Sequence, residues 1–367
     1  MSAGGCGGRG RRSGTPRYAT RADHIPTRSP SMIATVAPRD RRPRLPPVHP
    51  GRLPDRGVRR RARRSRRRSG HDIHHDEPDL VAGDAERDPG LTDTRTRLLT
   101  DLRRIEDDDY RLRPGEQEAD LVPALLAHLG DPAPELRDEL VYPTFRAFIT
   151  DGRLTEQELR TLLDTLIDDR HLFHGIGGLG DPSVFTRTFS MLVVALVLER
   201  HRRRPFLAAD QFARVRDALL RYHGQEQDLR GLVDEGGWAH AAAHGADALD
   251  ELVRCPEADP ATCRAVLDAL RGLLHNGATI FADEEDERIA TVVDALIEQS
   301  LLPAQEIAEW LGGLADRADQ PSSRAQMVAR TNTKNLLRSL HFRRPRTGPL
   351  AAAILAAEAR VNSFRAD

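Results

Sequence analysis

The sequence predicts an all-α fold: a HEAT- or armadillo-like α-solenoid or an array of helical hairpins, preceded by a disordered arginine-rich arm. From Leu91 onward, apolar residues recur at helical spacing and no segment alternates as a strand does. The connections between the predicted helices are short, which gives hairpins of about 40 residues, the length of HEAT and armadillo units. Because no clean repeat is visible in the sequence, an α/α toroid or an irregular bundle is the second expectation.

The net charge of −1 is the sum of two opposite parts. Residues 1–70 contain 20 arginines and three aspartates, a formal charge of +17. The remaining residues contain 35 basic and 53 acidic side chains, a formal charge of −18. We therefore divide the chain into a basic arm over residues 1–90 and one all-helical domain over residues 91–367.

Glycine, proline, serine and arginine dominate the arm, which shows no apolar periodicity. Such a segment buries too little apolar surface to fold, so we expect it to be disordered. Its densest run of arginines, residues 59–68, is of a kind that binds nucleic acid or anionic lipid without sequence preference. However, the whole chain contains only one lysine, Lys334. This bias is typical of GC-rich coding, so we expect the arm to be dispensable or to be translated from a misassigned start.

The helices of the domain are marked by apolar stripes and capping signals. Thr155 and Glu158 form a capping-box pair ahead of the first clear stripe. A helix through residues 185–198 is apolar nearly all round and is expected at the centre of the domain. Aspartate–proline pairs predict helix starts at Asp131, Asp181 and Asp259. The later stripes are Val266, Leu267, Leu270, Leu273 and Leu274; Ile289, Val292, Val293, Leu296 and Ile297; Ile307, Trp310, Leu311 and Leu314; and a final helix over Pro349–Val361.

The three cysteines, Cys6, Cys255 and Cys263, are an odd number without a CxxC pair. They fit neither a disulfide framework nor a structural zinc site, so a reducing, cytoplasmic location is expected. The longest purely apolar run, Met191–Leu198, is far shorter than the roughly 20 residues of a spanning helix, which predicts no membrane association. The paired arginines at 11 and 12 are followed by polar residues where an export signal is apolar, so no secretion is expected.

Five blocks of the chain follow a recognisable family pattern. They are Leu172–Gly177, Asp181–Ser190, Asp228–Gly231, Gly237–Asp247 and Glu285–Arg288. Together, over roughly residues 95–320, they resemble the uncharacterised bacterial family called domain of unknown function 2785. The resemblance implies a HEAT-like helical fold and carries over no catalytic residue. Phe281 replaces the tyrosine-like aromatic that is usual there, and the arm lies outside the resemblance.

The main candidate site is formed by His240, His244 and Asp247. On one helix these three side chains project within a sector of about 60°. Two imidazoles and a carboxylate can bind a divalent metal, or can act as a metal-free relay in which the carboxylate fixes an imidazole tautomer. The alanines between the histidines favour burial, and buried polar groups are normally paired, so a structural network is the first expectation. Ala241 stands where a zinc protease has glutamate, and no cofactor is predicted beyond a possible divalent metal.

Further candidates surround this trio in the blocks that resemble the family. Asp286 is the fourth catalytic candidate, and we expect Asp286 or Arg288 to face His240 across a groove. The ligand-binding candidates are Asp181, Arg187, Asp228, Arg230, Trp238 and Arg288. Glycines at 175, 177 and 180 spell G-x-G-x-x-G, but a helix precedes them and Asp181 stands where a phosphate would sit. We therefore interpret this segment as a turn whose glycines allow a loop to line a groove.

Two functions remain open on sequence alone. The first is a module that binds a protein or peptide partner, which follows from the helical-repeat architecture and the absence of a specific catalytic signature. The alternative is a hydrolase-like enzyme, possibly metal-assisted, that uses His240, His244 and Asp247. Nucleic acid is an unlikely partner except through residues 59–68, because the acidic domain repels phosphate. Burial of His240 under packed helices favours the binding module, and a water-filled cleft favours the enzyme.

Overall fold

The computed structural model describes residues 89–364, which are almost entirely helical. The arginine run at 59–68 and the rest of the predicted arm lie outside the described residues. The described elements, which all belong to one compact unit, are α1 (Pro89–Asp107), α2 (Glu118–Ala127), α3 (Pro134–Leu136), the π-helix η1 (Arg137–Val141), α4 (Tyr142–Thr150), α5 (Glu156–Leu166), α6 (Ser183–Arg203), α7 (Ala209–Gln225), β1 (Leu232–Val233), β2 (Gly237–Trp238), α8 (Ala241–Arg254), α9 (Pro260–Leu274), α10 (Glu285–Glu298), α11 (Ala304–Ala318), α12 (Arg324–Arg343) and α13 (Pro349–Val361). The all-α prediction is confirmed for this part of the chain.

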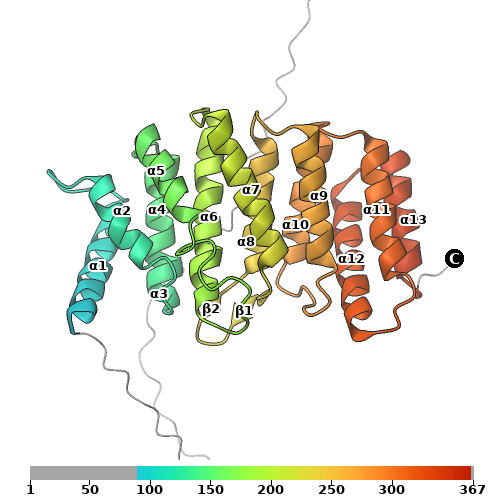
Figure 1. Cartoon of the computed structure of the whole chain (residues 1–367), viewed down its shortest axis with the longest axis horizontal. Coiled ribbons are helices and arrows are strands. Elements are labelled where there is room, and N and C mark those ends of the chain that lie inside the picture. The colour runs from blue at the N-terminus through green and yellow to red at the C-terminus, as the bar shows by residue number, and fades with distance from the viewer. Residues whose placement is uncertain (1–88, 365–367) are drawn as a thin grey trace, which may run out of the picture. The chain divides into compact units, whose positions relative to one another are not determined.

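The helices pack as a series of neighbouring pairs that follow chain order (Figure 1). Helices α4, α6, α8, α10 and α12 contact one another in succession. Beside them, α7 contacts α9 and α11 contacts α13. These helices therefore pack against the next helix but one in the sequence, and α11, α12 and α13 also pack against one another, as in an array of helical hairpins.

Helix α6 is enclosed by other helices, as its apolar composition predicts. It packs against α4, α5 and α8. Every side chain of the apolar run Met191–Leu198 is buried. A helix that is apolar on all sides must be covered on all sides, and three neighbours achieve this here. Among the described residues, no helix is both long and apolar enough to cross a membrane.

The capping predictions have mixed outcomes. Thr155 and Glu158 form the predicted capping box at the start of α5, and the Asp259 side chain accepts a hydrogen bond from the Thr262 backbone at the start of α9. The other two aspartate–proline pairs lie within two residues of the observed helix starts. Helix α3 begins after Ala133 rather than at Pro132, and α6 begins after Pro182. Asp131 accepts a hydrogen bond from the backbone of Ala133 in the turn before α3, and Asp181 accepts one from the backbone of Ser183, the first residue of α6.

Two elements near the centre of the chain were not predicted. Strands β1 and β2 form a small antiparallel hairpin in which Leu232 pairs with Trp238. Each strand has two residues, too few for an alternating pattern to be seen. The π-helix η1 follows α3 without a break. π-Helical turns inside helices often occur at functional sites, and η1 carries two buried charged residues, described below.

The glycine at 245 provides a test of how tightly α7 and α8 approach. A Cβ atom at Gly245 would lie 2.5 Å from Cε1 of His223 on α7. We expect Gly245→Ala to lower the free energy of unfolding, measured by urea titration, by about 1 to 2 kcal/mol because the ring must shift. Gly272 on α9 has open space around its Cβ direction, so Gly272→Ala is the matched control. That control is expected to stabilise the protein by about 0.5 to 1 kcal/mol, and equal effects at both positions would contradict the close approach.

Candidate functional site

His240 and His244 come together, although not in the way the sequence suggested. Helix α8 begins at Ala241, and His240 precedes it with a left-handed backbone conformation, φ 51°. The helical geometry predicted for the trio therefore holds only for His244 and Asp247. The ring centroids of the two histidines lie 5.6 Å apart, edge to face. Trp238 from the hairpin stacks on His240 at 4.4 Å, so the hairpin rather than the helix positions this ring.

His240 is bound on its far side by the segment before α10. Its Nε2 lies 2.9 Å from the backbone carbonyl oxygen of Asp283 and 3.7 Å from Oε1 of Glu285. Because a carbonyl oxygen only accepts hydrogen bonds, Nε2 carries the proton and donates it. Burial lowers the pKa of His240, so the ring is a neutral imidazole at pH 7.

His244 is more deeply enclosed than His240. Its ring meets the edge of Phe189 at a centroid distance of 5.5 Å, and its Nδ1 has no hydrogen-bond partner. Burial holds the pKa of His244 well below its usual range. This histidine is therefore a neutral group within the helix packing, where it has no access to solvent for proton exchange with a substrate.

Asp247 is engaged by an arginine from α10. Nη1 of Arg288 lies 2.8 Å from Oδ1 and 2.9 Å from Oδ2 of Asp247. Burial raises the pKa of Asp247 to about 6, and the Arg288 charge opposes that rise. The structure thus places Arg288 on this face, as expected for one of the two α10 candidates. The other, Asp286, accepts a hydrogen bond from the Ser339 hydroxyl on α12.

Two members of the trio, His240 and Asp247, are paired within the protein, whereas Nδ1 of His244 is not. His240 donates to a backbone carbonyl and Asp247 is bound by Arg288. Within residues 89–364, no three His, Cys, Asp or Glu side chains are placed so that they could hold one metal ion. The interpretation of the trio as a structural network stays a prediction.

Arg187 and Glu226 form a fully buried ion pair between α6 and the end of α7. Nε and Nη2 of Arg187 lie 2.6 and 3.0 Å from the two carboxylate oxygens of Glu226. Nη1 of Arg187 donates to the carbonyl of His174 and to the hydroxyl of Ser183, both at 2.8 Å. The guanidinium of Arg187 donates its hydrogen bonds to groups within the protein, so this ligand-binding candidate has a structural role.

Asp228 and Arg230 join the glycine-rich turn to the hairpin. Asp228 accepts hydrogen bonds from Nε and Nη2 of Arg230 at 2.7 and 2.6 Å and from the backbone N–H of Gly180 at 3.0 Å. Arg230 also donates to the carbonyl of Asp181. Three ligand-binding candidates from two different blocks, Asp181, Asp228 and Arg230, therefore meet and hold two loops together.

Sequence reasoning did not single out Arg137 and Asp138, which form a buried pair on η1. Arg137 donates to the carbonyls of Asp131 and Gly236 at 2.7 and 2.6 Å and lies 4.0 Å above the ring of Phe185. Burial raises the pKa of Asp138 to about 6 despite the neighbouring guanidinium. Adjacent opposite charges are usually solvated, so only the contact with the hairpin, almost 100 residues later in the chain, explains their burial.

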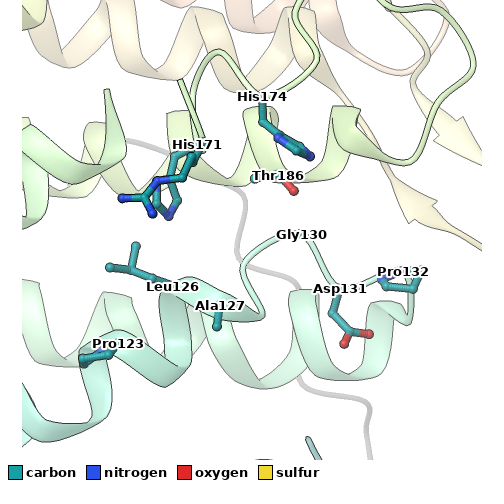
Figure 2. A pocket seen from close by; sticks show the side chains of 10 residues that line it. Pro123, Leu126, Ala127, Gly130, Asp131, Pro132, His171, His174 and Thr186 are labelled. Carbon is teal, nitrogen blue, oxygen red and sulfur yellow. The ribbon is translucent and has the colours of Figure 1, made fainter. Parts of the chain in front are cut away.

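A surface pocket of about 680 Å³ lies between α2 with the turn after it and the segment that carries His171 and His174 (Figure 2). Its lining residues are Pro123, Leu126, Ala127, Gly130, Asp131, Pro132, Arg170, His171, His174 and Thr186. Sequence reasoning did not single out Arg170, His171 or His174. The available signal was the glycine-rich turn that follows them, which was expected to let a loop line a groove.

The comparison with known families bears on the second half of the domain. The segment from residue 172 to residue 342, just under half of the chain, matches a family described as a protein of unknown function. This family is called DUF2785. This confirms the resemblance, although the match begins later and ends later than the expected range of 95–320. The DUF2785 match takes in His174, the buried Arg187–Glu226 pair, the hairpin and the His240 network. No curated protein and no solved structure matches the chain.

Proposed function

We propose that this chain is a module that binds a protein or peptide partner. The observation that carries the proposal is a contrast in burial. The side chains of His240 and Asp247 are 13% and 10% exposed and are bound by internal partners. The pocket beside α2 is open at the surface and falls within the range of about 300 to 1,000 Å³ that is typical of ligand sites.

The packing of the helices supports the same function. Stacked helical hairpins present long surfaces built from successive helices, and such surfaces are typical of modules that bind extended partners. The hydrolase alternative needs water and a substrate at His240. Trp238 stacks on one side of that ring, and the carbonyl of Asp283 binds its Nε2.

Selection from a library of displayed linear peptides on the biotinylated full-length chain tests the proposal. We expect a recurring sequence among the recovered peptides, and we expect its synthetic form to bind with a Kd below about 100 µM by calorimetry, the range of many transient complexes. Streptavidin without the chain is the control for selection. Failure to recover any recurring sequence with folded protein would contradict the proposal, and cleavage of the bound peptide would favour the hydrolase.

A further inference from the structure

We infer that the pocket beside α2 binds a carboxylate that is attached to an apolar group, supplied by an acidic residue next to an aliphatic one in a partner peptide. The inference rests on the proposed function, because it takes the ligand to be a peptide. It depends on the chemistry of the two walls of the pocket, on the pairing of its one carboxylate and on its size.

One wall carries nitrogen groups that can meet an anion. The His174 imidazole has no hydrogen-bond partner among the described residues and lies beside Thr186 at the pocket (Figure 2). The side chain of Arg170 is 86% exposed, and its Nε comes no closer than 3.8 Å to the Asp168 carboxylate. These two side chains can turn toward a ligand without breaking a hydrogen bond in the protein.

His171 completes this wall in a fixed orientation. Its Nδ1 lies 2.8 Å from Oδ1 of Asp168, and since a carboxylate only accepts, Nδ1 is the donor. The second ring nitrogen, Nε2, has no partner in the described part of the chain, so the protonated ring has a donor left for a ligand. Asp168 also accepts the backbone N–H groups of Arg170 and His171, which fixes the loop.

The opposite wall is apolar. Pro123, Leu126 and Ala127 are spaced three and four residues apart on α2, so they lie along one face of that helix. Pro132 extends the surface beyond the turn. This wall offers no hydrogen bond to a ligand from its side chains, and it suits an aliphatic group next to the carboxylate.

The one carboxylate of the pocket lining, Asp131, is already paired. Its two oxygens accept hydrogen bonds from Nε and Nη2 of Arg95 at 2.8 and 2.9 Å. Burial alone would raise its pKa, but the hydrogen bonds from His128 and Arg95 outweigh burial and hold the pKa well below its usual range. Figure 2 shows its carboxylate directed away from His174. The lining therefore presents cationic and donor groups to a ligand without an unpaired negative charge.

The size of the pocket limits the ligand to a short segment. A volume of about 680 Å³ accommodates a few side chains and excludes a folded domain. A carboxylate between Arg170 and His174 with an aliphatic neighbour against Leu126 would use both walls. A free aliphatic acid also carries a carboxylate and an apolar group, so the experiment must distinguish a free acid from a peptide.

Calorimetry with two blocked pentapeptides tests the inference on the full-length chain. We expect acetyl-Ala-Leu-Glu-Leu-Ala-amide to bind at least tenfold more tightly than the peptide with Gln in place of Glu, because only the first offers a charge-assisted hydrogen bond. Arg170→Ala and His174→Ala are each expected to weaken binding of the Glu peptide about tenfold. Arg324→Ala, an exposed arginine on α12 outside the pocket, is the control and should leave binding unchanged.

The outcomes separate this inference from the proposed function. Equal binding of the Glu and Gln peptides, or binding unaffected by Arg170→Ala and His174→Ala, overturns the inference. If peptides recovered by library selection bind equally well to both variants, the proposed function stands and the inference falls. If 4-methylpentanoate binds and His174→Ala weakens it while no peptide binds, the chemistry of the pocket is supported and the proposed function falls. Circular dichroism of each variant confirms that the helices remain folded.

Discussion

Replacing Arg187 with methionine is expected to lower the free energy of unfolding by about 3 to 5 kcal/mol. The substitution leaves the Glu226 carboxylate buried with no counter-charge and removes the donor that binds the carbonyl of His174. Breaking one side of a buried ion pair is costly because the remaining charge has lost its solvation without compensation. Urea unfolding followed by circular dichroism measures the effect.

Two further variants show whether the charge or the packing is responsible. Combining Arg187→Met with Glu226→Gln removes the uncompensated charge while keeping an oxygen for the backbone N–H groups of Gln227 and Asp228. The double variant should therefore recover about 1 to 3 kcal/mol relative to Arg187→Met alone. Arg200→Ala on the same helix, whose hydrogen bond to the Arg204 carbonyl is exposed, should cost less than about 1 kcal/mol. A similar loss for Arg187→Met and Arg200→Ala would contradict a buried pair.

The features of the fold that could be predicted are those encoded within a few residues. The Thr155–Glu158 capping box and the apolar run Met191–Leu198 each lie within one helical segment, so periodicity and capping chemistry identify them directly. The π-helix and the two-residue strands are too short to leave a periodic pattern. Their form depends on tertiary contacts such as that of Arg137 with the carbonyl of Gly236, which sequence spacing does not reveal.

In the candidate site, too, local features could be predicted from the sequence, whereas tertiary contacts could not. Arg288 binds Asp247, whereas His240 is held by the carbonyl of Asp283, which lies outside the blocks that resemble the family. The left-handed backbone at His240 follows from its place between the hairpin and α8, where its N–H also bonds the carbonyl of Arg230. The surface pocket combines α2 with residues 170–174, which are separated by more than 40 residues, so no local motif could indicate it.

Asp250→Asn is expected to stabilise the protein at pH 8 by up to about 4 kcal/mol and to have almost no effect near pH 4. Asp250 on α8 is 4% exposed, pairs with Arg254 at 2.9 Å and lies near Glu251 and Asp247. Burial raises its pKa from 3.8 to about 7. Between these two pH values, the folded protein holds a proton that the unfolded chain has lost. The contribution of Asp250 to the free energy of unfolding therefore falls as pH rises, by about 1.4 kcal/mol for each pH unit between these two values.

Urea unfolding of wild type and variant at pH 8, 6 and 4 measures this difference. Asparagine keeps an oxygen for Arg254 but cannot ionise, so the advantage of the variant should grow as pH rises through the window and level off above about pH 7. Asp268→Asn on α9 is the matched control, because this carboxylate is 68% exposed beside Arg271 and its removal should change stability by less than about 0.5 kcal/mol at every pH. A less stable Asp250→Asn protein at pH 8 would mean that Arg254 compensates the buried charge fully. The cluster of carboxylates on α8 would then stabilise the fold rather than oppose it.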